Sequence, residues 1–220
     1  MLMLAGRDFD VRLEHGGLRY QDATGVLDLP AGRLAGAHQV LNAGLAVAVA
    51  RTFGLPDQSI SEGLRRVSWP ARMQPLTAGP LAERASARGA DLWIDGAHNP
   101  HAFKSLAQSL RALREADGRP LVVILGVLAN KDLEGIFAAL RSVGSLKLFL
   151  VGFDASSAAD PALLLDGARA AGLCAEARPD VSSALDLALS DAGPPPRVVI
   201  CGSLYLAGEV LALDPETWPR

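Results

Sequence analysis

Short apolar runs alternate with helical stretches from about residue 73 to the C-terminus, and this alternation limits the possible fold more than any other feature. The strand candidates cover residues 73–77, 91–95, 121–126, 147–152, 174–177 and 197–202. Helical patterns cover residues 100–115, 132–142, 160–171 and 181–191, and a last helix starts near Leu204. Runs such as "LVVILG" and "RVVIC" are continuously apolar, as expected for strands that helices cover on both faces. The pattern predicts an α/β fold with a mostly parallel, doubly wound sheet.

The first 70 residues follow a different pattern. Residues 9–29 alternate apolar and polar side chains around turn signals at His15-Gly16-Gly17 and at residues 23–25, which predicts a small antiparallel meander. Residues 37–53 have the length and alanine content of a helix and are apolar nearly all round, so we expect this helix to be buried. A second helix is expected over residues 59–67. The prolines of "WPARMQP" suggest a hinge, which would divide the chain into two domains, residues 1–70 and 71–220, the first of them truncated.

The composition excludes several classes of protein. With 220 residues, 50% of them hydrophobic, the chain can bury a sizeable core. Its net charge of -3 argues against a nucleic-acid partner, which would need clustered Lys and Arg. Cys174 and Cys201 stand in apolar segments without metal-like spacing and are interpreted as buried thiols. The sequence contains neither a signal-peptide pattern nor a long uninterrupted apolar run, so we expect a soluble, cytoplasmic protein without a membrane partner.

The stretch "WIDGAHNPH" is the strongest candidate for a site. Asp95 ends a predicted strand, Asn99 can cap the next helix, and Pro100 suits its first position. The N-terminus of such a helix attracts anions. A carboxylate at the strand tip just before it suits a sugar diol, because it can accept two O–H hydrogen bonds. The alternative is a capped turn with an exposed aspartate. A metal pair of His98 and His101 is disfavoured because no Cys or further acid stands at ligand spacing, and no metal ligand is predicted in this chain.

Two more loops follow predicted strands at the same sheet edge. In residues 126–132, Asp132 is interpreted as a helix cap, and Lys131 is either solvated or close to an anion. In Gly202-Ser203, the glycine permits close backbone approach and the serine caps the last helix. Neither the G-x-x-x-x-G-K-[ST] nor the G-x-G-x-x-G phosphate-binding pattern occurs in the chain, and the G-x-S-x-G elbow is also absent.

Several of these motifs together resemble one known family. "HQVLNA", "WPARM", "DGAHNPHA" and "CGSLYLAGEV" occur in the order found in bifunctional folylpolyglutamate synthase/dihydrofolate synthase, within the Mur ligase superfamily. "GRDFDVRLEHGGLRYQD" looks like the meander late in that family's central domain. The resemblance covers essentially the whole chain. It implies that residues 1–70 end a central ATPase domain and that residues 71–220 form the Rossmann-like C-terminal α/β domain.

The resemblance also implies an activity. Such enzymes are ATP-dependent, Mg²⁺-requiring ligases that form an amide bond between L-glutamate and dihydropteroate or a folyl-polyglutamate, through an acyl phosphate. They serve folate biosynthesis and one-carbon metabolism, and we expect a monomer that binds only small molecules. The family's phosphate-binding loop and magnesium ligands precede this region and are missing here. The chain is therefore expected to be a fragment that is inactive alone.

Four residues match the family's site by motif. Asn42 would hydrogen-bond the adenine, and Arg72 would contact the ATP phosphates. The commoner family form has glycine where this chain has Ala71, which puts the loop geometry in question more than the arginine. Asp95 would bind the ribose hydroxyls, and His98, the candidate catalytic residue, would lie near the phosphates or the incoming glutamate.

Two other functions remain open at this point. One is a different Mur-type ligase that adds an amino acid to a cell-wall precursor, although "DGAHNPHA" and "GSLYLAGEV" favour the folate branch. The other is a non-catalytic nucleotide-binding module that has lost its catalytic half.

Overall fold

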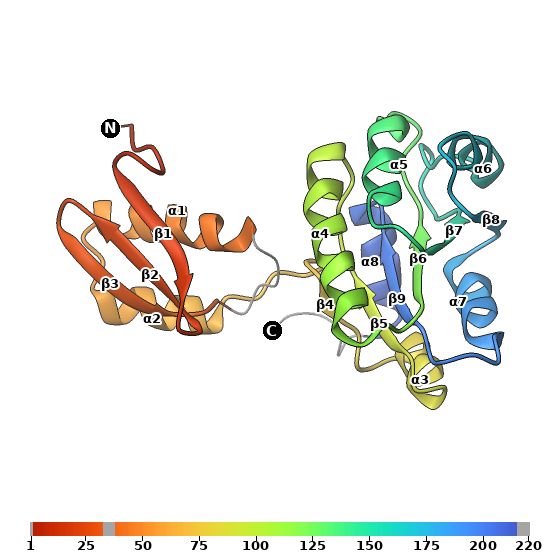
Figure 1. Ribbon diagram of the computed structural model, residues 1–220, viewed down its shortest axis with the longest axis horizontal. Coiled ribbons are helices and arrows are strands. Elements are labelled where there is room, and N and C mark those ends of the chain that lie inside the picture. The colour runs from red at the N-terminus through yellow and green to blue at the C-terminus, as the bar shows by residue number, and fades with distance from the viewer. Residues whose placement is uncertain (1, 33–37, 215–220) are drawn as a thin grey trace. The chain divides into compact units, whose positions relative to one another are not determined.

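The computed structural model describes residues 2–32 and 38–214, and the chain forms two compact units, Met1–Trp69 and Pro70–Arg220. We call them the N-terminal unit and the C-terminal unit, and Figure 1 labels their elements. The division falls in the proline-containing segment interpreted above as a hinge. None of the helices in the described ranges is long and apolar enough to cross a membrane.

The N-terminal unit begins with the predicted meander. Its strands are β1 (Phe9–Glu14), β2 (Gly17–Asp22) and β3 (Gly25–Pro30), paired antiparallel in sequence order. The first turn has positive φ at both His15 (51°) and Gly16 (79°), which matches the twist of a two-residue hairpin. In the second turn the Asp22 carboxylate accepts hydrogen bonds from the backbone and hydroxyl of Thr24 (2.8 and 2.6 Å). Local turn chemistry therefore sets the register of the meander.

Two helices, α1 (His38–Thr52) and α2 (Asp57–Arg66), cover one face of this small sheet. The core residues they share with the strands are Phe9, Leu18, Tyr20, Leu29, Val47, Ala48, Ile60 and Leu64. The expectation that α1 is buried nearly all round is wrong. Leu41, Leu45 and Val49 are exposed, because α1 packs on the meander through one face only.

The C-terminal unit contains a six-stranded sheet in the order β4-β5-β9-β6-β7-β8. The strands are β4 (Gln74–Pro75), β5 (Asp91–Ile94), β6 (Leu121–Leu125), β7 (Lys147–Val151), β8 (Ala175–Arg178) and β9 (Arg197–Cys201). All pairings are parallel except that of β4 with β5. The predicted mostly parallel α/β sheet is confirmed. The last strand, β9, lies between β5 and β6, which brings the ends of these three strands together (Figure 1).

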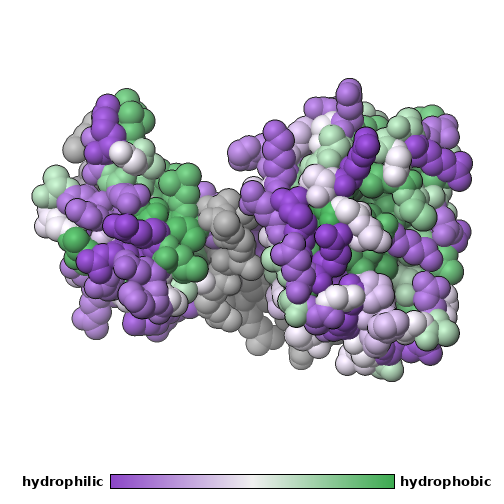
Figure 2. Space-filling view, in the orientation of Figure 1, coloured by the Kyte–Doolittle hydropathy of each residue, from purple (hydrophilic) through white to green (hydrophobic). Residues whose placement is uncertain are grey.

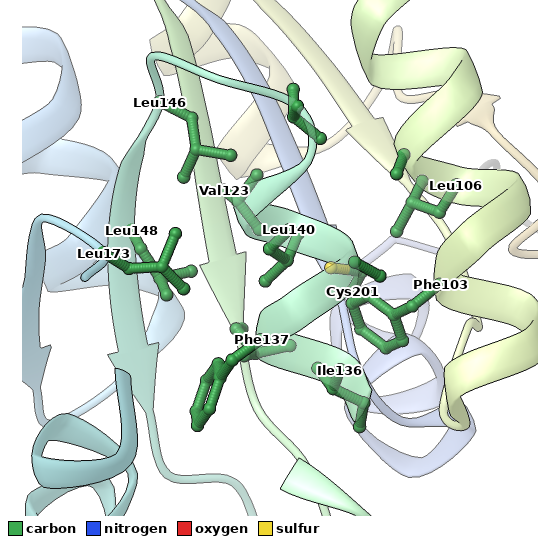
Figure 3. Packing of buried hydrophobic residues seen from close by; sticks show 14 of the residues in the cluster. Phe103, Leu106, Val123, Ile136, Phe137, Leu140, Leu146, Leu148, Leu173 and Cys201 are labelled. Atoms are coloured by element: carbon green, nitrogen blue, oxygen red, sulfur yellow. The ribbon is translucent and has the colours of Figure 1, made fainter. Parts of the chain in front are cut away.

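Helices cover both faces of this sheet. The six helices are α3 (Pro80–Ala87), α4 (Pro100–Asp117), α5 (Leu133–Arg141), α6 (Pro161–Ala170), α7 (Val181–Ser190) and α8 (Leu204–Ala212). Residues of α4, α5 and α6 share one core with the strands, and residues of α3, α7 and α8 share the other. Figure 3 shows the first core, where Phe103 and Leu106 of α4 lie near Cys201 of β9. Side chains of both faces are therefore buried, which accounts for the continuously apolar strands.

Two elements differ from the sequence prediction. The expected strand over residues 73–77 is reduced to Gln74–Pro75, and it pairs antiparallel at the sheet edge. It cannot lengthen as a regular strand because Met73 has a positive φ of 44° and Pro75 lacks a backbone N–H. Helix α3 was not predicted. Its eight residues carry only a short apolar stripe of Leu81, Ala82 and Ala85, too little for a recognisable period.

The packing of α1 on β1 can be tested at a glycine. A methyl group at Gly44 would lie 2.8 Å from Val11 Cβ and 3.3 Å from Phe9 Cε2, whereas one at Gly63 of α2 would meet nothing within 4 Å. We expect Gly44→Ala to destabilise the N-terminal unit by about 1–3 kcal/mol through overpacking. Gly63→Ala should stabilise it by about 0.5–1 kcal/mol because it restricts the unfolded chain.

Hydrogen exchange of the α1 and β1 amides would measure both effects in the N-terminal unit alone. Equal shifts in the same direction for the two variants would contradict this description of the α1–β1 contact.

Candidate functional site

Three loops meet at the carboxyl edge of the parallel sheet. They follow β5, β6 and β9, which are neighbours in the sheet, and this is the edge where open α/β sheets bind ligands. The first residue after β6 bonds to the last residue of β9, since Gly126 N donates to Cys201 O (3.1 Å). At Gly202, whose φ is 113°, an added methyl group would collide with the Gly126 carbonyl. The predicted need for close backbone approach at Gly202 is confirmed.

Asp95 stands at the tip of β5 and is 8% exposed. Its Oδ2 accepts a hydrogen bond from Met73 N (2.8 Å), and its Oδ1 accepts one from Ala97 N (2.8 Å). The second bond closes a local turn of the kind that aspartate favours, in which its side chain accepts from the backbone N–H two residues later. The first bond joins the strand tip to the segment that enters the C-terminal unit. The side chain thus has a structural role that the sequence analysis did not identify.

The segment 71–73 has an unusual backbone. Ala71 and Met73 have φ values of 52° and 44°, in the left-handed region, which costs a residue other than glycine roughly 1–2 kcal/mol. Glycine, which the resemblance implies at the first of these positions, would avoid that cost, and Ala71 keeps the conformation despite it. Backbone bonds hold the segment on the strand tip, including Gly96 N to Ala71 O (2.7 Å).

Arg72 lies between these two left-handed residues and is half-buried. Its Nη1 donates to the Ala71 carbonyl (3.2 Å), and within the described part of the chain it forms no ion pair. The guanidinium lies beside Gly96, where an added methyl group would come within 3.0 Å of Nη1. The absence of a side chain at Gly96 is therefore what lets Arg72 lie against the tip of β5.

His98 and Asn99 complete the first loop. The Asn99 side chain accepts from Ala102 N (2.9 Å) and caps α4, and Pro100 occupies the first turn, as predicted. His98 Nδ1 lies 2.8 Å from Gly96 O. A carbonyl oxygen can only accept, so Nδ1 must carry a proton, and the neutral imidazole then has its lone pair on Nε2.

Caps explain most of the polarity in the other two loops. Asp132 accepts from Gly135 N (3.0 Å) and Ser203 accepts from Tyr205 N (3.1 Å), so both predicted N-caps are confirmed. Behind the loops, burial first and the Asp95 carboxylate second raise the pKa of the Cys201 thiol. Cys201 is therefore a neutral thiol in the core, as predicted. The prediction that Cys174 is also buried is wrong, since this residue is exposed.

Asn42 belongs to α1 in the N-terminal unit. It lines a cavity of about 710 Å³ within that unit, and its Nδ2 donates to Gln39 Oε1 (3.0 Å). The cavity walls are mainly apolar, and the residues lining it include Val40, Ala43, Val47, Ile60, Leu64 and, as polar members, Gln39, Asn42 and Ser59. An apolar cavity with a few polar groups in its lining is typical of a small-molecule site.

The structure thus brings Arg72, Asp95 and His98 together at one sheet edge and places Asn42 in the other unit. Among the described residues, no three His, Cys, Asp or Glu side chains are grouped closely enough to hold a metal ion. The Mg²⁺ implied by the resemblance finds no ligand set in this part of the chain.

Removing the Asp95 carboxylate tests its structural role. Asp95→Ala leaves two backbone N–H groups without this acceptor, and we expect the C-terminal unit to lose about 2–4 kcal/mol of unfolding free energy. Asp132→Ala, which removes an exposed cap, should cost only about 1 kcal/mol. Denaturant unfolding of both variants measures the difference, and equal losses would contradict the role assigned to Asp95.

Comparisons with known proteins agree with the motifs. A family model described as "Mur ligase, glutamate ligase domain" matches residues 81–204. A probable bifunctional folylpolyglutamate synthase/dihydropteroate synthase of Haloferax volcanii is 33% identical over 227 residues, which cover 98% of this chain and 25% of that protein. The structure of E. coli FolC in complex with DHPP and ADP aligns with a TM-score of 0.77 at 25% identity, covering 95% of this chain and 46% of that one.

A further solved structure, of a bifunctional folylpolyglutamate synthase/dihydrofolate synthase with Mn, AMPPNP and L-glutamate bound, aligns with a TM-score of 0.74 at 25% identity. The alignment covers 94% of this chain and 46% of that one. The chain therefore spans half or less of the relatives it matches. By its family model, its motifs and its fold, the chain belongs to the folylpolyglutamate synthase/dihydrofolate synthase family and contains the Mur ligase glutamate ligase domain.

Proposed function

We propose that this chain is the nucleotide- and glutamate-contacting part of an ATP-dependent ligase that joins L-glutamate to dihydropteroate or a folyl-polyglutamate through an acyl phosphate. The observation that supports this most is Arg72, a half-buried guanidinium without a carboxylate partner in the described ranges, beside Gly96 in the loop that leads to the N-terminal end of α4. Both features attract a polyanion. The solved relative that contains AMPPNP and L-glutamate supports the same assignment.

Arg72 would contact the ATP phosphates. Its position between two left-handed residues, held by the bonds of Gly96 and Asp95, limits the directions the side chain can take. A preorganised guanidinium loses little freedom when it binds phosphate, so more of the interaction contributes to affinity.

Asp95 would accept hydrogen bonds from the ribose hydroxyls. An ionised carboxylate only accepts hydrogen bonds, which suits the two hydroxyl donors of a ribose. The bonds that Asp95 accepts from Met73 N and Ala97 N fix the direction of its carboxylate. Asn42 would bind the adenine edge from the N-terminal unit, where its amide offers both a donor and an acceptor.

His98 would act on the amine of glutamate. In this step the amine nitrogen attacks the carbonyl carbon of the acyl phosphate, the amide C–N bond forms, and the C–O bond to phosphate breaks as phosphate leaves. The nitrogen must also lose a proton. Because the Gly96 carbonyl holds a proton on Nδ1, Nε2 is the ring nitrogen of His98 that would take it.

The ligase reaction needs more than this chain. The phosphate-binding loop that the resemblance implies is absent from these 220 residues. We therefore assign the reaction to a longer protein, or to a complex, that carries this sequence together with such a loop. The chain alone is expected to bind ATP weakly or not at all.

Ribose recognition can be separated from the structural role of Asp95. In a ligase that carries this sequence and a phosphate-binding loop, ATP should bind about tenfold or more tightly than 2′,3′-dideoxy-ATP, because the carboxylate loses its hydroxyl partners. In Asp95→Asn this preference should shrink. Calorimetry with both nucleotides measures the ratio within each variant, so a general loss of stability cancels. Equal affinities in the wild-type protein would rule out the ribose contact.

The substrate class is tested by amide formation in the same ligase. With ATP and L-glutamate, we expect product from dihydropteroate or a folyl-polyglutamate and none from a UDP-muramoyl precursor. Arg72→Ala should lower kcat/KM by about a hundredfold or more, as is typical when a phosphate-stabilising group is lost. Product only from the muramoyl precursor would favour another Mur-type ligase. No product from either, with ATP still bound, would favour a non-catalytic module.

A further inference from the structure

Gln74 lies next to the candidate site, and the sequence analysis gave it no role. It belongs to β4, and its backbone pairs with Ile94 of β5, so the residue is fixed on the edge of the sheet. Its side chain turns back along the chain, where Oε1 accepts a hydrogen bond from Ala71 N (3.0 Å). Since only the oxygen of a side-chain amide can accept, the bond also fixes which way the amide faces. The side chain of Gln74 therefore closes a loop over residues 71–74.

This bond pairs a backbone group that is shielded from water. Hydrophilic residues form much of the face of the C-terminal unit seen in Figure 2, but Ala71 is only 2% exposed. A buried backbone N–H without a partner is unfavourable, and native proteins pair nearly all of them. The loop after β5 already provides two bonds to this segment, from Gly96 N to Ala71 O and from Met73 N to Asp95. Gln74 adds a third bond, which comes from β4.

The three bonds hold a conformation that the residues themselves disfavour. Ala71 and Met73 have φ values of 52° and 44°, in the left-handed region. Such a conformation persists only where the surrounding structure imposes it. Arg72 lies between them, with Nη1 donating to the Ala71 carbonyl (3.2 Å) and lying beside Gly96. A return of Ala71 to the right-handed region would rotate this carbonyl away, so the direction of the guanidinium depends on what holds φ at Ala71.

We propose that Gln74 is a positioning residue for Arg72. Its side-chain oxygen keeps residues 71–73 in the left-handed conformation and thereby directs the guanidinium along Gly96. The consequence for ATP rests on the proposed function, in which Arg72 contacts the phosphates, whereas the effect on the loop does not. Gln74 itself needs no contact with nucleotide. The alternative is that Gln74 only stabilises the edge strand β4, in which case its loss would lower stability without affecting Arg72.

The first experiment examines the loop in the 220-residue chain alone. Gln74→Met keeps the length of the side chain and removes the acceptor, whereas Gln74→Glu keeps an acceptor oxygen. In Gln74→Met, hydrogen exchange of the Met73 and Gly96 amides should become about tenfold faster or more, because the loop opens locally. Nuclear magnetic relaxation of Arg72 Nε should show increased motion. Exchange at Val199, in the middle of the sheet, should keep its rate and so show that the unit remains folded.

The matched variant and the wild type decide the outcome of this experiment. Gln74→Glu should keep the Met73 and Gly96 amides as slow as they are in the wild type. Unchanged exchange of these two amides in Gln74→Met would overturn the proposal. An Arg72 Nε that is as ordered in Gln74→Met as in the wild type would overturn it as well.

The second experiment is a double-mutant cycle in a ligase that carries this sequence and a phosphate-binding loop. Gln74→Met should lower kcat/KM for ATP about tenfold in the otherwise wild-type enzyme. In an Arg72→Ala background the same change should have less than a twofold effect, because there is no guanidinium left to position. Adding Ala71→Gly to Gln74→Met should recover most of the loss, since glycine adopts a positive φ without strain. Equal losses in the two backgrounds would show a merely structural role and contradict the proposal.

The two experiments separate this inference from the proposed function. If Arg72→Ala leaves kcat/KM unchanged while the loop opens in Gln74→Met, the phosphate contact of the proposed function is wrong and the positioning role stands. If Arg72→Ala lowers kcat/KM and Gln74→Met does not, the positioning role is wrong and the proposed function stands.

Discussion

The carboxylate of Asp95 is the interaction on which the carboxyl edge of the sheet depends. It accepts backbone hydrogen bonds from Met73 and from Ala97, and so joins the tip of β5 to the segment entering the C-terminal unit and to the loop leading into α4. Two left-handed residues in that segment are unfavourable by themselves, and these bonds, with that of Gly96 N to Ala71 O, hold them in place. The direction of Arg72 follows from this arrangement.

The same arrangement connects structure to chemistry. A buried acid, a guanidinium without an anionic partner among the described residues, and a histidine whose Nδ1 proton is held by a carbonyl all lie within one loop cluster. Backbone atoms orient each of these side chains, so their directions are fixed without a bound ligand. The N-terminal unit adds the amide of Asn42, which lines a mainly apolar cavity.

Much of the fold could be predicted because its signals are local. Continuous apolar runs located β6, β7 and β9, and short polar residues before helices located the caps at Asn99, Asp132 and Ser203. The predictions that differ from the structure concern features that depend on packing with residues distant in the sequence. The burial of α1 was overestimated because apolar composition does not show which neighbours are present. Helix α3 was missed because eight residues give little periodicity.

The sequence by itself determined the strands, the caps, the family motifs and the residue types at the candidate site, since each depends on neighbours a few positions away. Only the tertiary structure decided that β9 lies between β5 and β6, that Asp95 bonds to Met73 across 22 positions, and that Gly96 leaves space for Arg72. These contacts join segments far apart in the chain, and periodicity carries no information about which distant backbone groups will meet. The positive φ of Ala71 and Met73 has the same origin: alanine and methionine give no local sign of it, and the surrounding bonds impose it.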